Sequence, residues 1–282
     1  MQPSRPPGVI PLRPLTLGEL LDTAIELLRR NAVALLLAGP AVAAAEQAVL
    51  YPLRAAAAIT PPGYLPHGRL GGYWLVIAAG FATEAVVIAL LGGLAARAAA
   101  SDLLGEHLPA RRLLAPTGSR FGAVAVVALV AGLAVGVCTV VGLVPWVIGY
   151  GLVGLAVPTL VIDRYGVGRA LLRSARLSVR AGMRAASVRV AGYLAWLAIR
   201  AALTLGGPFV LYELFPGQPW LPGAVVAIAV AVNGVAYPAL ACLDAVLHLE
   251  TRMRTEGLDI WLARALRPGA AEVGADLPRV LP

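Results

Sequence analysis

The stretch RPLTLGELLDTAIELLRRNAVALLLAG, residues 13–39, joins two different helical patterns without a loop between them. In its first half, leucines recur at spacings of three and four, and acidic residues occupy the opposite face. Thr16 and Glu19 have the T-x-x-E spacing of a capping box, so we expect a helix to start at Leu17. The second half, from Ala32 on, contains no charged residue. The stretch therefore predicts an amphipathic surface helix that leads directly into a membrane-spanning helix.

The composition of the whole chain also indicates a membrane protein. Its 282 residues are 59% hydrophobic and only 13% charged, whereas a soluble domain has about 25% charged residues. The mean hydropathy is +0.81. Cys138 and Cys242 both lie within apolar runs, so we expect neither a disulfide nor a metal site from them.

Six apolar runs are long enough to cross a hydrocarbon core of about 30 Å as helices. The expected spans are at about residues 32–53, 73–96, 121–141, 146–162, 190–212 and 221–247. The expected surface helices are at about 17–30, 101–115 and 167–186. Together they form a membrane domain of residues 16–266, between flexible ends at 1–15 and 267–282. The predicted fold class is therefore all-α, a polytopic membrane helical bundle.

The placement of arginine predicts the orientation, because basic residues accumulate on the cytoplasmic side of a membrane. All 23 basic residues are arginines. The two ends of the chain and the connections between spans two and three and between spans four and five contain most of them: Arg5, Arg13, Arg29, Arg30, Arg97, Arg111, Arg112, Arg120, Arg164, Arg169, Arg173, Arg176, Arg180, Arg184, Arg189, Arg252, Arg254, Arg264, Arg267 and Arg279. The other side has Arg54 and Arg69, and Arg200 falls inside a span. Both termini are therefore predicted to be cytoplasmic.

Aromatic residues at the predicted outer ends of the spans agree with this orientation. Tryptophan and tyrosine are enriched where a span meets the membrane interface. The residues expected there are Tyr51, Tyr73, Trp74, Trp146, Tyr212 and Trp220. A competing interpretation takes Arg29, Arg30 and the following apolar run as a cleaved signal peptide. We favour a retained helix, because the preceding segment is long and carries its own helix-start signal.

A surface helix followed by an apolar hairpin recurs along the chain. Residues 101–125 precede the third span, and residues 166–188 precede the fifth. The segments LLDTAIELLRRNAV and LLRSARLSVRAGMRAA both begin with a leucine pair and reach arginine before the next span. Two interpretations stay open: three helix-plus-hairpin repeats, or chance similarity in a chain rich in Leu, Ala and Arg.

A stripe of arginines runs along the third surface helix. Steps of four, three, four and four residues place the members on one narrow face, beside an apolar face: Arg169, Arg173, Arg176, Arg180 and Arg184. A basic amphipathic helix is attracted to anionic lipid head groups by about 1 kcal/mol per arginine. The alternative is that these arginines only keep the connection in the cytoplasm. Nucleic acid is not an expected partner, because no binding motif accompanies the stripe.

Motifs at the two ends of the chain resemble a known family. RPLTLGELLDTAIELLRRN and ETRMRTEGLDI are similar to the start and the end of the bacterial glycerophosphoryl diester phosphodiesterase membrane-domain family. The second motif matches at Glu250, Arg252, Arg254, Glu256, Gly257 and Asp259. Glu250 stands where an Asp is usual, and Thr251 where an aliphatic residue is usual. The resemblance implies six spans in a bacterial plasma membrane, with cytoplasmic ends. The family takes its name from members fused to a catalytic barrel, which we do not expect here.

Candidate catalytic residues are few. The histidines are His67, His107 and His248, and His248 follows Asp244 by four residues, on the same helix face. We expect a hydrogen-bonded or solvated pair there, because two ligands are too few for a metal site. The motifs G-x-S-x-G and H-E-x-x-H and the P-loop are missing from the sequence. A phosphodiesterase needs clustered acid, base and usually metal ligands. We therefore expect no enzymatic activity, no metal and no cofactor.

Polar side chains inside the expected spans are the remaining candidates, because charge in a bilayer is costly and often functional. They are Glu46, Glu84, Arg200, Asn233 and Asp244. Glu84 and Arg200 lie about half-way along their spans, so we expect them to form a pair. The pair either fixes how the helices pack or binds an ion or substrate, and we favour packing.

These observations leave three classes of function. We favour a structural or accessory membrane subunit that acts through its cytoplasmic face, in contact with the lipid bilayer and with another membrane protein or a second copy of itself. The alternative is a transporter or permease for a small or lipidic solute, using Glu84 and Arg200. An intramembrane enzyme ranks last.

Overall fold

The computed structural model describes residues 10–59, 61, 64, 70–116 and 119–265, and the regular elements in these ranges are helices. In chain order they are α1 (Leu17–Arg30), α2 (Ala32–Ala56), α3 (Leu70–Leu103), α4 (Ala110–Leu114), α5 (Phe121–Val141), α6 (Leu143–Val153), α7 (Ala156–Val161), α8 (Val167–Arg180), α9 (Arg184–Ala201), the π-helical turn η1 (Ala202–Gly206), α10 (Gly207–Leu214), α11 (Leu221–Glu256) and α12 (Leu258–Ala265).

Among the residues that the structure describes, six helical segments are long and apolar enough to cross a membrane. They are Ala32–Ala56, Leu70–Leu103, Phe121–Val141, Leu143–Val161, Arg184–Leu214 and Leu221–Glu256. Each coincides with one of the expected spans. The connection between the fourth and fifth spans is shorter than expected because α9 begins at Arg184, and α11 continues past the last apolar run to Glu256. The prediction of an all-α bundle with six helices of spanning length is confirmed.

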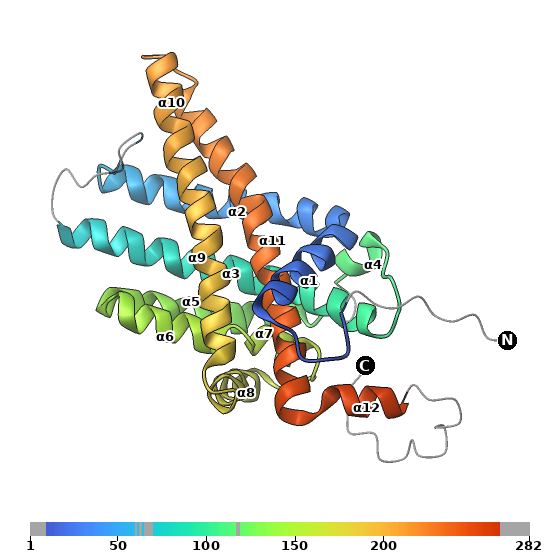
Figure 1. Ribbon diagram of the computed structural model, residues 1–282. Helices are drawn as coiled ribbons and strands as arrows, with labels where there is room; N and C mark the ends of the chain where they lie inside the picture. The colour runs from blue at the N-terminus through green and yellow to red at the C-terminus, as the bar shows by residue number, and fades with distance from the viewer. Residues whose placement is uncertain (1–9, 60, 62–63, 65–69, 117–118, 266–282) are drawn as a thin grey trace.

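The helices cross rather than all running alongside one another. Figure 1 shows α2, α3 and α5 lying side by side, while the hairpin of α9, α10 and α11 crosses them. Helix α11 packs against both α2 and α3, and its neighbour α9 packs against α6. Leu35, Leu91 and Leu240, from α2, α3 and α11, belong to the buried core. Helix α10 projects away from α1, α4, α8 and α12 (Figure 1). We call the part of the bundle formed by these four helices the surface-helix end.

Helix α1 begins at the expected capping box. The Glu19 amide donates to the Thr16 hydroxyl, and the Thr16 amide donates to the Glu19 carboxylate. Hydrogen bonds from Arg13 and from Thr16 lower the pKa of Glu19 to about 2, so this carboxylate stays charged at neutral pH. Leu20 and Leu27 are fully buried against the bundle. The leucine face of α1 therefore packs mainly on protein, as the amphipathic pattern allows.

The expected surface helix at 101–115 is wrong as a single element. Helix α3 continues to Leu103, and Gly105 then adopts a positive φ of 68°, which ends the helical path. Helix α4 begins only after Pro109. The guanidinium of Arg97 closes the connection by donating to the backbone carbonyls of three residues: Arg112, Leu113 and Ala115.

The expected surface helix at 167–186 is shorter in the structure. Helix α8 ends at Arg180, and both Gly182 and Met183 adopt a φ of 62°. These two left-handed residues reverse the chain, so that α9 starts at Arg184.

The expectation of a flexible segment at residues 1–15 is wrong for residues 10–15. Ile10 and Leu15 are buried, and the Ile10 amide donates to the Asp102 carboxylate at 3.1 Å. These contacts dock the segment before α1 against α3. Residues 1–9 and the expected C-terminal tail at 267–282 lie outside the described residues.

Two glycines determine how closely α2 and α11 approach. A Cβ atom on Gly39 would lie 2.3 Å from the carbonyl oxygen of Gly234 and 2.6 Å from Cγ of Pro238. A Cβ on Gly234 would lie 2.8 Å from Cγ of Pro40. Small residues permit such backbone contact between helices in membranes. The crossing of α2 and α11 therefore has no room for a methyl group at either position.

Replacing Gly39 with alanine should lower stability, because the new methyl group would meet backbone atoms that cannot turn aside. We expect a loss of about 1–3 kcal/mol, as for overpacked cores, measured by thermal unfolding in detergent. Gly80→Ala in α3 is the matched control, because a Cβ there meets nothing within 4 Å. It should be neutral or slightly stabilising. Equal effects of the two changes would show that the close approach does not limit stability.

Candidate functional site

An ion pair between α9 and α3 lies in the interior of the bundle. The guanidinium of Arg200 donates from both terminal nitrogens to the two carboxylate oxygens of Glu84, with a distance of 3.0 Å for Nη2–Oε2. The hydroxyl of Tyr193 donates to the same Glu84 oxygen at 2.9 Å. Both charged side chains are about 90% buried. The predicted contact between Glu84 and Arg200 is confirmed.

A second carboxyl group lies beside this pair. Glu46, on α2, accepts a hydrogen bond of 2.6 Å from the hydroxyl of Tyr237 and lies 3.1 Å from the hydroxyl of Thr83. The guanidinium of Arg200 lies 5.4 Å from the ring centre of Tyr237. Four spanning helices thus meet at one polar cluster, in which two carboxyl groups surround a single guanidinium. We call these residues the buried polar cluster: Glu46, Thr83, Glu84, Tyr193, Arg200 and Tyr237.

A further ion pair joins α9 to α11. Arg189 donates to both oxygens of Asp244, at 2.7 and 3.0 Å, and its guanidinium lies 3.7 Å from the ring centre of Tyr150. A Cβ on Gly154 would collide with Arg189, so this glycine makes room for the guanidinium. The expected placement of Arg189 in a connection is wrong, because α9 already begins at Arg184.

The sequence spacing of three polar residues on α9 could have identified its buried face. Arg189, Tyr193 and Arg200 follow one another at intervals of four and seven residues, which is one face of a helix. All three side chains are buried and point to partners on other helices. The sequence analysis counted Arg189 among the cytoplasmic arginines of a connection. It therefore did not recognise Arg189 as part of this buried helix face.

An aromatic cluster separates the two ion pairs. The ring centres of Tyr150 and Tyr193 are 4.8 Å apart, and those of Trp146 and Phe81 are 5.0 Å apart. Trp146 is buried, so its expected place in an interfacial belt is wrong. Its position near the start of an apolar run resembled a membrane boundary, but its ring packs inward against Phe81 of α3 and Tyr193 of α9.

The remaining intramembrane candidates lie apart from the buried polar cluster. Asn233 is buried next to Gly234, where α2 and α11 cross. Asp244 faces Arg189, and the expected pairing of Asp244 with His248 is wrong. His248 instead contacts Asp163, which comes from the connection between α7 and α8. A partner from a loop could not be inferred from helical spacing.

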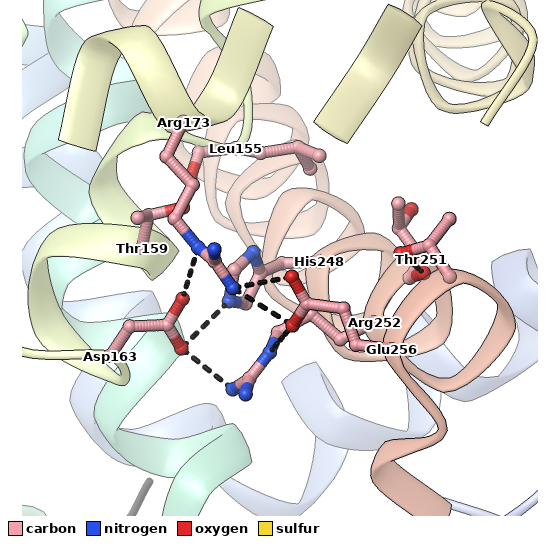
Figure 2. A network of polar contacts seen from close by, with 9 residues as sticks. Leu155, Thr159, Asp163, Arg173, His248, Thr251, Arg252 and Glu256 are labelled. Carbon is pink, nitrogen blue, oxygen red and sulfur yellow. Dashed lines mark hydrogen bonds and ion pairs between the residues drawn. The ribbon is translucent and has the colours of Figure 1, made fainter. Parts of the chain in front are cut away.

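Asp163 is the centre of a charged network at the surface-helix end (Figure 2). It accepts hydrogen bonds from Arg252 at 2.7 Å and Arg173 at 3.2 Å, and it contacts His248 at 3.3 Å. Glu256 completes the network by accepting from Arg173 at 2.6 and 2.8 Å and from Arg252 at 2.9 Å. These contacts fasten α8 and the connection before it to the end of α11.

The charge of Asp163 is maintained by its neighbours. Burial alone would raise the pKa of Asp163, but His248, through its charge and its hydrogen bond, and the charges of Arg252 and Arg173 outweigh burial and hold the pKa below its ordinary value. Because the pKa of Asp163 is depressed in the folded state, its contribution to stability is complete at pH values above the ordinary pKa of an aspartate. The contribution is lost only as the pH falls through the lower pKa of the folded state.

A second network at the same end involves the start of α1. Arg184 and Arg254 both donate to the backbone carbonyl of Leu15, at 2.7 and 2.9 Å. The buried carboxylate of Glu250 pairs with both guanidinium groups. The C-terminal motif residues Glu250, Arg252, Arg254 and Glu256 are thus used in contacts within the protein.

The arginine stripe divides into two groups. Arg173 and Arg184 form the internal contacts just described, so they are not available to lipid in the way expected from the sequence. Arg169, Arg176 and Arg180 are exposed, and no acidic residue in the described part of the chain forms an ion pair with them. A hollow of about 420 Å³ lies among these arginines, Tyr165 and two leucines of α8.

The exposed face of α8 also carries apolar side chains. They are Leu172, Val179 and Met183, of which Met183 follows the helix. Such a face offers positive charge and apolar surface together. Among the described residues, no group of three or more His, Cys, Asp or Glu side chains is arranged to hold a metal ion.

The chain matches no protein-family model, no curated protein and no solved structure. The resemblance drawn from its two end motifs stays a prediction.

Removing one member of the Arg200–Glu84 pair should strand the other in an apolar interior. Arg200→Leu and Glu84→Leu should each lower the stability in detergent by about 3–5 kcal/mol, measured by thermal unfolding. The double substitution should recover much of the loss, since it leaves no charge unpaired. The loss from Arg200→Leu shrinks if the remaining Glu84 takes up a proton. Two harmless single substitutions would show that the groups do not depend on each other.

Proposed function

We propose that this protein is a structural or accessory subunit of a bacterial plasma membrane, which acts through its surface-helix end on the cytoplasmic side. The observation that carries the proposal is the exposed face of α8. There, Arg169, Arg176 and Arg180 lie beside apolar side chains and have no acidic partner among the described residues. The charged side chains inside the bundle, in contrast, are engaged with one another.

The internal ion pairs support a structural role for the buried charges. Arg200 ties α9 to α3, and Arg189 ties α9 to α11. Breaking such a pair is costly, whereas forming it adds little net stability. Their evident effect is to select one arrangement of helices, which leaves the exterior of the protein as the place for interactions.

The face of α8 suits anionic lipid head groups. Three guanidinium groups near a bilayer surface contribute about 1 kcal/mol each to binding. Leu172 and Val179 lie on the same exposed side, where they can enter the acyl boundary as in other interfacial helices. Lipid bound here would sit next to the network of Asp163 and Glu256, which holds α8 on α11.

The orientation is part of the proposal. The arginine distribution supports cytoplasmic termini, and the surface-helix end carries the start of α1 together with α8 and α12. Exposed aromatic residues at the opposite ends of α2 and α11, Tyr51 and Trp220, fit the outer interface.

A transporter or permease is the second candidate. The observation that favours it is the presence of two carboxyl groups, Glu46 and Glu84, around one guanidinium within spanning helices. Such a cluster carries an excess negative charge unless it binds a proton or a cation.

Native mass spectrometry in a mild detergent tests the first proposal. The protein should retain anionic phospholipid and should appear in a complex with a second chain or a second copy. Changing Arg169, Arg176 and Arg180 together to Gln should reduce lipid retention about tenfold or more, since each arginine is worth about 1 kcal/mol. The same three positions changed to Lys keep the charge and should keep the lipid. A monomer with equal lipid retention in all three proteins would contradict the proposal.

Cysteine labelling in intact cells tests the orientation. In a background with Cys138 and Cys242 changed to Ala, a membrane-impermeant maleimide should label Gln218→Cys directly. It should label Arg180→Cys only after the membrane is permeabilised. Both positions are exposed, whereas Ser174 on α8 is fully buried and would not report. The opposite labelling pattern would reverse the proposed topology.

A further inference from the structure

The buried polar cluster contains more carboxyl groups than cationic groups. Glu46 on α2 and Glu84 on α3 are both more than 90% buried, and Arg200 is the cation that contacts the cluster. If both carboxyl groups were ionised, the interior would carry one unbalanced negative charge. An isolated charge in an apolar medium is very costly, and buried groups avoid the cost by changing their protonation.

Glu84 is the carboxyl group that receives the charge of Arg200. Its two oxygens each accept from a different nitrogen of the guanidinium, which is the bidentate geometry of a strong ion pair. The hydroxyl of Tyr193 provides a third hydrogen bond. Glu84 is therefore the ion-pair partner of Arg200 within the cluster.

The hydrogen-bonding partners of Glu46 are neutral. Tyr237 donates its hydroxyl hydrogen to Oε2 of Glu46 at 2.6 Å, and Thr83 lies 3.1 Å from Oε1. Both partners are hydroxyl groups, so neither balances a charge. Arg200 lies over the ring of Tyr237 at 5.4 Å from its centre, and both of its terminal nitrogens are directed to Glu84.

The hydrogen bonds of Thr83 indicate that the carboxyl group of Glu46 carries a proton. A threonine hydroxyl has one hydrogen to donate, yet its oxygen lies 3.0 Å from the Gly80 carbonyl and 3.1 Å from Oε1 of Glu46. Within a helix, threonine commonly donates to the carbonyl three or four residues earlier. The contact with Oε1 then needs a hydrogen from Glu46. With that hydrogen in place, the contacts among Glu46, Thr83, Tyr237 and Gly80 are all satisfied.

We propose that Glu46 is a proton-binding site within the membrane-spanning bundle, and that it holds a proton at neutral pH while the neighbouring Glu84 is ionised. The groups that face Glu46 come from three elements: Thr83 and Glu84 on α3, Arg200 on α9, and Tyr237 on α11. With the proton bound, the cluster is electrically neutral.

Loss of the proton changes the partners available to Arg200. The guanidinium would then have two carboxylates within the same cluster, and it already lies over the ring of Tyr237, whose hydroxyl contacts Glu46. Proton uptake and release at Glu46 are thereby linked to the contact that holds α9 on α3. This property goes beyond the proposed role of the surface-helix end, and it does not require that role.

Infrared spectroscopy of the purified protein tests the proposal directly. At pH 7 the wild-type protein should show the C=O stretching band of a protonated carboxylic acid, shifted when the solvent is exchanged for D₂O. Glu46→Gln should remove this band. Glu26→Gln, which changes a half-buried carboxylate of α1 that pairs with Arg29, should retain it. A wild-type spectrum without the band, or a band that persists in Glu46→Gln, would overturn the proposal.

A stability comparison gives an independent readout. Glutamine has the shape of a neutral glutamic acid, and its amide can donate to Thr83 while its oxygen accepts from Tyr237. Glu46→Gln should therefore move the Tm in detergent at pH 7 by less than about 2 °C. Glu84→Gln has the same change in size but strands Arg200, and should lower the Tm by about 6 °C or more. Equal losses in both variants would mean that Glu46 is ionised.

Discussion

A guanidinium inside an apolar bundle needs a carboxylate, and this requirement positions the fifth span. Arg189 and Arg200 are eleven residues apart on one face of α9, about three helical turns. One binds Asp244 on α11 and the other binds Glu84 on α3. Much of the remaining surface of α9 and α10 is apolar and exposed, so it offers little specificity of its own. The two ion pairs therefore determine which side of this hairpin faces the bundle.

The end of α11 serves as a junction for segments that are distant in sequence. Glu250 and Arg254 hold the start of α1 together with Arg184, while Arg252 and Glu256 hold Asp163 and Arg173. The charged residues of the C-terminal motif are thus occupied by internal contacts. These charged residues form hydrogen bonds to polar groups that the surface helices bring to this end, such as the Leu15 carbonyl and the Asp163 carboxylate.

Hydropathy and helix-capping rules predicted the six spanning helices and α1, because span length and cap chemistry are local properties of the chain. Depth along the spans was enough to pair Glu84 with Arg200. The partner of Arg189 could not be found in this way, since its depth depends on where α9 begins, and that start is determined by the left-handed turn at Gly182 and Met183. His248 was misassigned because its partner, Asp163, comes from a connection whose path follows no periodic pattern. Charge alone also could not distinguish the internal arginines of α8 from the exposed ones.

The double hold on the Leu15 carbonyl has a consequence for the order of biosynthesis. Arg184 and Arg254 follow Leu15 by 169 and 239 residues. At roughly 5–20 residues per second, a ribosome needs about 10–50 s to travel from Leu15 to Arg254. Throughout that interval α1 lacks α11, the helix against which it packs most extensively in the folded bundle. The first helix of the chain is therefore among the last to form its final contacts. Because it is amphipathic, it can lie on the bilayer surface until then.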